Sequence, residues 1–128
     1  MNNKILFTGG LIGMVAIILG AFGAHSLKQF LSIEQLNTFE TGVKYQMYHS
    51  LFLLFLGINP LITLKTKKII FTLISLGILL FSGSIYFLAT MTVTGINFKP
   101  IGIVTPVGGL LLILGWGIFS YQFIKNKS

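Results

Sequence analysis

The residues that could do chemistry are few, and most of them lie between residues 20 and 49. His25 and His49 are the only histidines, and Glu34 and Glu40 are the only carboxylate side chains. Cysteine and aspartate do not occur, and the sequence has no zinc motif, phosphate-binding glycine loop or nucleophile elbow. The sequence therefore predicts a protein that is not an enzyme.

The two histidines permit three kinds of chemistry. If the first apolar run ends where the second begins, the two imidazoles are expected at similar depth. They could then be hydrogen-bonded packing residues, the ligands of a metal or haem, or part of a proton or substrate relay. We favour packing, because the chain offers no third ligand. The relay and the haem site stay open as alternatives.

Glu40 and Lys44 stand four residues apart, with the glutamate on the N-terminal side. This is the favourable order for an ion pair along a helix. On a helical wheel Gly42, Tyr45 and His49 lie on the opposite side. The charged pair and the histidine therefore face different neighbours, which argues against one active site built from this helix alone.

Composition indicates that the elements positioning these residues are embedded in lipid. Hydrophobic residues make up 54% of the 128 positions and charged residues 9%, whereas soluble domains have about 25% charged residues. All nine cations are lysines at the ends of apolar runs, and the formal charge is +7. Lysines in such places are typical membrane-edge anchors, and the absence of arginine disfavours nucleic-acid binding. The lipid bilayer is therefore the expected partner, with no nucleic acid.

We predict an all-α fold of one domain over residues 1–128, a four-helix transmembrane bundle with a short amphipathic interfacial helix. The interfacial segment covers about 25–41 and includes a capping box formed by Ser32 and Gln35. Each apolar run is long enough to cross a hydrocarbon core of about 30 Å. The predicted spans are about 5–24, 43–64, 69–91 and 106–124.

The first run also resembles a cleaved signal peptide, but its length and its glycines favour a span. Its small residues recur at steps of three or four and form one smooth face, which is typical of close helix packing in lipid. This face could pack inside the monomer, which we favour, or against another copy in a homo-oligomer. Its members are Gly9, Gly13, Ala16, Gly20 and Ala24.

Two prolines are expected to mark where helices end or begin in the other spans. Pro60 is expected to kink or end the second span, and a basic turn with Lys65, Lys67 and Lys68 should follow it. Thr105 is expected to cap the fourth span, with Pro106 at its first position.

The lysines also predict orientation. Six of them fall on the side of both termini and three on the other side, so the positive-inside rule places both termini in the cytoplasm. The six are Lys4, Lys65, Lys67, Lys68, Lys125 and Lys127, and the three are Lys28, Lys44 and Lys99.

Four segments together resemble one known family: GAFGAH at 20–25, FETGVKYQMYHS at 39–50, LFSGSIY at 80–86, and TPVGG with a later GW between 105 and 116. They resemble the domain-of-unknown-function 423 family of small four-span bacterial membrane proteins. Ser26 stands where such proteins commonly have glycine. The resemblance implies a four-helix membrane fold and supplies no reaction. It marks as candidate site residues His25, Glu40, Lys44, Tyr45, Gln46, His49, Ser82, Ser84 and Tyr86.

The sequence therefore predicts a multi-pass cell-membrane protein without enzymatic activity, a packing or accessory component. One alternative is a small transporter or channel that uses the polar cluster. The other is a redox subunit that holds haem between His25 and His49.

Overall fold

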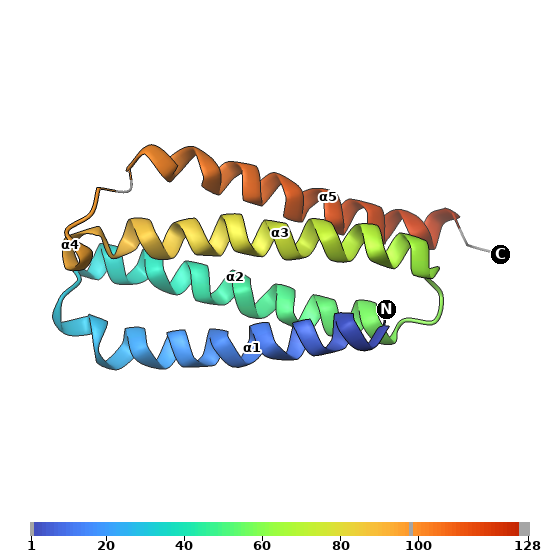
Figure 1. The fold of residues 1–128 in the computed structure, drawn as a ribbon, viewed down its shortest axis with the longest axis horizontal. Coiled ribbons are helices and arrows are strands. Elements are labelled where there is room, and N and C mark those ends of the chain that lie inside the picture. The colour runs from blue at the N-terminus through green and yellow to red at the C-terminus, as the bar shows by residue number, and fades with distance from the viewer. Residues whose placement is uncertain (1, 98, 126–128) are drawn as a thin grey trace.

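A computed structural model of the chain describes residues 2–97 and 99–125, and every regular element in this part is helical. Four long helices run antiparallel to their neighbours, and the start of α1 lies at the same end of the molecule as the end of α5 (Figure 1). The end that joins α1 to α2 is called the elbow end below. The long helices are α1 (Asn2–His25), α2 (Ile33–Ile58), α3 (Leu64–Ala89) and α5 (Val104–Lys125). The short elements are η1 (Leu27–Gln29), α4 (Met91–Thr94) and η2 (Lys99–Ile103).

The long helices pack in chain order, α1 on α2, α2 on α3, and α3 on α5. Figure 1 shows the result as a row, with α1 and α5 as its edges. Over residues 2–97 and 99–125, α1 and α5 share no packed interface. The helices therefore form an open row rather than a bundle in which the first and last helices meet.

Helix α2 is longer at its start than the sequence predicts. The Ser32 hydroxyl accepts the Gln35 amide at 3.1 Å, and the Gln35 side chain accepts the Ser32 amide at 2.9 Å, which confirms the capping box. The helix that begins here continues without interruption to Ile58, and Asn59 and Pro60 end it. The predicted separate interfacial helix over 25–41 is therefore wrong. Residues 33–41 are the first turns of α2, because no proline follows the capping box to stop the helix.

The starts of α3 and α5 also differ from prediction. Helix α3 begins after Thr63, whose hydroxyl accepts the Thr66 amide at 3.3 Å, so the three lysines at 65–68 lie in its first turns rather than in a turn before it. Helix α5 follows η2 directly at Val104, so Thr105 lies inside the helix and is not its N-cap. Pro106 falls in the first turn, where a missing amide proton leaves no bond unmade.

Three helical segments are long and apolar enough to cross a membrane, namely Asn2–Gln29, Leu64–Ala89 and Lys99–Lys125. Their outward faces carry large apolar side chains, such as Phe7, Ile17, Leu79 and Ile113, each at least 65% exposed. Water would penalise such surfaces, whereas lipid tails accept them. Helix α2 is less apolar, because polar residues are concentrated in its first half.

Small residues allow the helices to approach closely. Gly9, Gly13 and Ala16 are buried against α2, so that part of the predicted stripe packs inside the monomer. The end of the stripe is Gly23 rather than Ala24, which is exposed. A Cβ on Gly23 would lie 2.9 Å from the Phe39 ring. The stripe thus keeps the 3.5-residue period that two helices need to stay in contact along their length.

Candidate functional site

Several of the predicted site residues are joined by hydrogen bonds in the structure. Gln46 lies at the centre of this network, in the middle of α2, and is 6% exposed. Its Nε2 donates to the Ile12 carbonyl of α1 at 2.9 Å. Its Oε1 accepts the Tyr86 hydroxyl of α3 at 2.6 Å. One amide side chain therefore joins three helices, with a donor and an acceptor both used.

Two serines join the same helices through backbone carbonyls. Ser50 donates to Gly9 O at 2.7 Å, and Ser82 donates to Gly42 O at 2.7 Å. A hydroxyl can reach a neighbouring backbone only where that backbone is close. Gly13 shows how close it is, because a Cβ there would lie 2.6 Å from Ser50 Oγ.

His49 connects α2 to α5 and is 4% exposed. The Trp116 indole N–H donates to His49 Nε2 at 2.9 Å, and His49 Nδ1 lies 2.7 Å from the Tyr45 carbonyl. Because an indole nitrogen can only donate, Nε2 must accept, and the proton of a neutral imidazole then sits on Nδ1 and is donated to Tyr45 O. Both ring nitrogens are occupied, so His49 has no nitrogen left for a metal.

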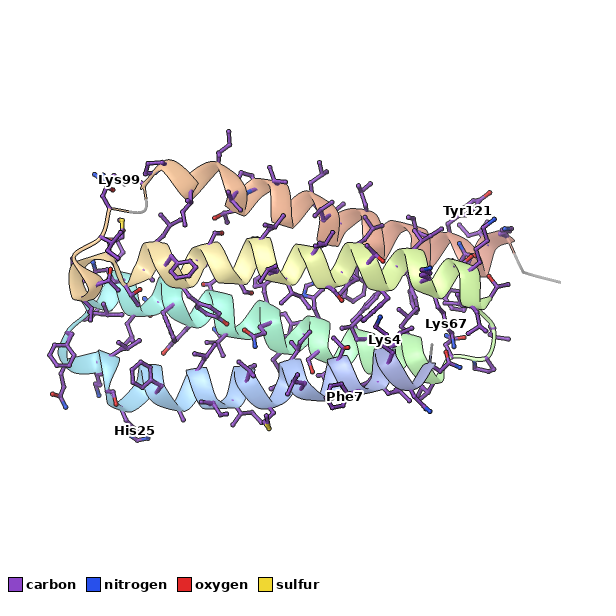
Figure 2. All side chains as sticks on the ribbon, in the orientation of Figure 1. Lys4, Phe7, His25, Lys67, Lys99 and Tyr121 are labelled. Carbon is purple, nitrogen blue, oxygen red and sulfur yellow. The ribbon has the colours of Figure 1, made fainter. Side chains whose placement is uncertain are left out.

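Two further contacts complete the links between helices. Ser84 of α3 and Thr105 of α5 are hydrogen-bonded through their hydroxyls. At the other end of the molecule Lys67, 3% exposed, donates to Gly57 O at 3.3 Å and to Asn2 Oδ1 at 3.0 Å (Figure 2). Its ammonium thus covers a free carbonyl in the last turn of α2, where the helix dipole favours a cation.

The remaining predicted site residues lie outside this network. His25, Glu40 and Lys44 are all exposed, and Figure 2 shows His25 at the elbow end of α1, pointing away from the other helices. The predicted ion pair between Glu40 and Lys44 is wrong. The two residues are described, and no ion pair joins them.

The expectation that the two histidines share one depth is also wrong. Ser50, next to His49, bonds to Gly9, which is 16 residues before His25 on the same helix. At 1.5 Å per residue this separates the two imidazoles by about 24 Å along the helix axes. The cause is the early start of α2, which carries His49 about four turns into the molecule. They cannot hold one haem between them.

Sequence reasoning missed four of the linking residues, namely Ser50, Lys67, Thr105 and Trp116. Ser50 carried a usable signal, since it follows Gln46 by four residues and therefore lies on the same helical face. The bond from Trp116 to His49 depends on the register of α2 against α5. No local pattern encodes that register.

This arrangement holds the helices together through hydrogen bonds between them. Among the described residues, no group of three or more histidine, cysteine, aspartate or glutamate side chains gathers in one place. A hollow of about 660 Å³ is lined mostly by apolar residues, including Phe52 and Phe55 of α2 and Trp116 of α5, with Asn59 at its polar edge. A second hollow of about 340 Å³ has His49 in its wall.

Several known membrane proteins are similar to this chain across most of its length. The family described as "Protein of unknown function (DUF423)" matches residues 19–109. A UPF0382 membrane protein of Haemophilus influenzae is 37% identical over 100% of this chain and 99% of its own length. The UPF0382 membrane protein YwdK of Bacillus subtilis is 36% identical over 94% and 95%, and the UPF0382 inner membrane protein YgdD of Escherichia coli is 30% identical over 98% and 93%. No solved structure matches. The chain therefore belongs to the DUF423/UPF0382 family of membrane proteins, whose molecular function is unknown.

Proposed function

We propose that this protein is a non-enzymatic accessory component of the cell membrane, which acts by packing laterally against other membrane helices. The observation that supports this most is that the polar side chains of the network already have hydrogen-bond partners within the protein. The side chains of Gln46, His49, Ser50, Ser82 and Tyr86 all bond to a backbone carbonyl or to another side chain in the network. A transport pathway needs polar groups that are free to bind a passing solute.

The open row of helices also leaves surfaces for such lateral packing. Both edge helices, α1 and α5, leave an apolar side without an intramolecular partner. In lipid, helix association is driven by van der Waals packing and hydrogen bonds rather than by burial from water. Two free edges suit a protein that joins a larger assembly.

We further propose that α2 is a fourth crossing and that both termini face the cytoplasm. If α1 and α3 cross the bilayer, the chain must return from the elbow end to the start of α3, and α2 is the element that makes this path (Figure 1). The end with the termini carries most of the lysines, as the positive-inside rule requires. Because the chain has no cysteine, a single cysteine at Asn97 should react with an impermeant maleimide in intact cells, whereas one at Thr66 should react only after permeabilisation. The reverse pattern would contradict the orientation.

The accessory role is tested by measuring flux. Purified protein in liposomes loaded with pH-sensitive and potassium-sensitive dyes should leak no faster than empty liposomes. The competing function, a small transporter or channel, is favoured by the position of His49 in the wall of the 340 Å³ hollow. A leak that His49→Ala abolishes while the protein stays folded would establish the transporter and refute the accessory role.

A further inference from the structure

The two hollows between α2 and α5 form one groove, because Trp116 lies in the wall of both. The smaller hollow has Tyr45 in its wall, and the larger one continues along α2 to Ile58. This stretch of helix is about 20 Å long. The α2–α5 groove is therefore parallel to the helices and longer than one half of a hydrocarbon core of about 30 Å.

The lining of the α2–α5 groove is aromatic and apolar. Phe52 is 4% exposed, and its ring centroid lies 4.4 Å from that of Trp116 and 5.0 Å from that of Phe119. Phe55 and Ile58 line the same hollow and are 65% and 66% exposed. Such a surface accepts hydrocarbon, and lipid acyl chains run in the same direction as the membrane helices.

The end of the groove that lies away from the elbow end is cationic. The last lining residues, 59–61, belong to the connection between α2 and α3. Lys65 and Lys68 follow in the first turns of α3, and both are exposed. Between them, Lys67 reaches back to Gly57 O in the last turn of α2. An apolar groove thus ends beside a group of ammonium ions.

The acidic side chains of the chain are far from these lysines. Glu34 and Glu40 are the only two, and both lie in the first half of α2. Glu40 is 17 residues before Gly57 on the same helix, which is about 25 Å. A second copy inserted in the same direction would bring the same cations to this end and keep its glutamates at the other. Charge complementarity therefore favours an anion from the surrounding membrane.

We propose that the α2–α5 groove binds an anionic phospholipid from the leaflet at this end of the molecule. One acyl chain lies against Phe52 and Trp116, and the phosphate accepts hydrogen bonds from the ammonium groups of Lys65 and Lys68. Basic pockets between membrane helices are suited to such headgroups. The site does not depend on the proposed accessory role.

Quenching of fluorescence by brominated lipids tests the proposal on the full chain. Trp116 is the only tryptophan, and bromine quenches an indole that it contacts. The protein is placed in phosphatidylcholine vesicles that contain a small fraction of phosphatidylglycerol with bromine on its acyl chains. At equal mole fraction, this lipid should quench Trp116 more strongly than brominated phosphatidylcholine, with a relative affinity at least about fivefold higher.

Charge substitutions test the headgroup contact. Lys65→Gln and Lys68→Gln should each lower the relative affinity for the brominated phosphatidylglycerol about fivefold. Lys28→Gln is the matched control, because Lys28 is an exposed lysine at the elbow end, and it should leave the affinity unchanged. A melting curve in detergent shows that each variant is folded.

A second control separates the groove from a general enrichment of anionic lipid near lysines. Phe7→Trp in a Trp116→Phe background moves the only tryptophan to a 70% exposed position near the start of α1 and close to Lys4. There, the two brominated lipids should quench equally.

Three results would overturn the lipid site. Equal quenching of Trp116 by both lipids excludes a preference for the anionic headgroup. The same preference at position 7 assigns the effect to the membrane surface rather than to the groove. If neither lipid quenches Trp116, protein covers the groove, either a second copy or another partner.

Discussion

Replacing Gln46 by leucine tests whether the polar interior holds the helices together. The change removes the bond from Gln46 Nε2 to Ile12 O and the bond from the Tyr86 hydroxyl to Gln46 Oε1, at 2.9 and 2.6 Å. Interhelical hydrogen bonds in membranes are worth about 0.6 kcal/mol on average and up to about 1.7 kcal/mol each. Leaving the half-buried Tyr86 hydroxyl without this acceptor adds about 1–3 kcal/mol.

The expected loss for Gln46→Leu is therefore about 2–4 kcal/mol of unfolding free energy. Tyr86→Phe in the same protein removes the stranded hydroxyl. The double variant should then be more stable than Gln46→Leu alone, with a net loss of about 1–2 kcal/mol. This recovery distinguishes a stranded donor from a simple change of packing volume.

Equilibrium unfolding in mixed micelles with increasing SDS measures these free energies. Tyr48→Phe is the matched control, because Tyr48 is exposed on the same helix, and it should change stability by less than about 0.5 kcal/mol. If Gln46→Leu and Tyr86→Phe are additive, the two side chains do not interact and the argument for the network fails.

Three other features of the row give predictions that the same unfolding assay checks. Gly108→Val should destabilise by about 1–3 kcal/mol or more, because a side chain there collides with the α3 backbone. Gly117→Ala, which meets open space, should be neutral or stabilise by up to about 1 kcal/mol, and equal effects of the two would contradict the packing account. Lys67→Met should lower the unfolding free energy by about 1–3 kcal/mol, because it leaves the Gly57 carbonyl at the end of α2 without its donor. Lys68→Met is the control, because Lys68 is exposed, and it should not have this effect. An unchanged stability in Lys67→Met would show that this hydrogen bond does not stabilise the end of α2. Ser32→Ala should cost about 1 kcal/mol and raise amide exchange in the first turn of α2, and unchanged exchange would exclude the capping box as its anchor.

Local chemistry explains which parts of the fold were predictable. The capping box at Ser32 and the stop at Pro60 act within a few residues, so the sequence predicts them directly. The glycine stripe predicts the α1–α2 interface because a repeat of three and four residues has a definite geometry on a helix. The prediction failed at Ala24 only because the repeat leads to Gly23.

The errors came from features that depend on the whole length of a helix. Polar residues between 33 and 41 resemble a separate interfacial helix, yet nothing after Ser32 stops the helix from continuing. That one difference placed His49 about four turns from the elbow end and gave it Trp116 as a partner instead of His25. The contact of Lys67 with Asn2 joins residues that are far apart in the sequence, so only the assembled row reveals it.

The open row also explains why this interior is polar. In water, an apolar core would hold four helices together, but lipid tails solvate leucine as well as a neighbouring helix does. Close glycine contacts and hydrogen bonds must then supply the specificity. Gln46, Ser50 and Ser82 do so by donating hydrogen bonds to backbone carbonyls on α1 and α2. A backbone carbonyl is present whatever side chain the accepting residue carries. The links are therefore sensitive to the spacing of the helices rather than to the identity of the residue that accepts.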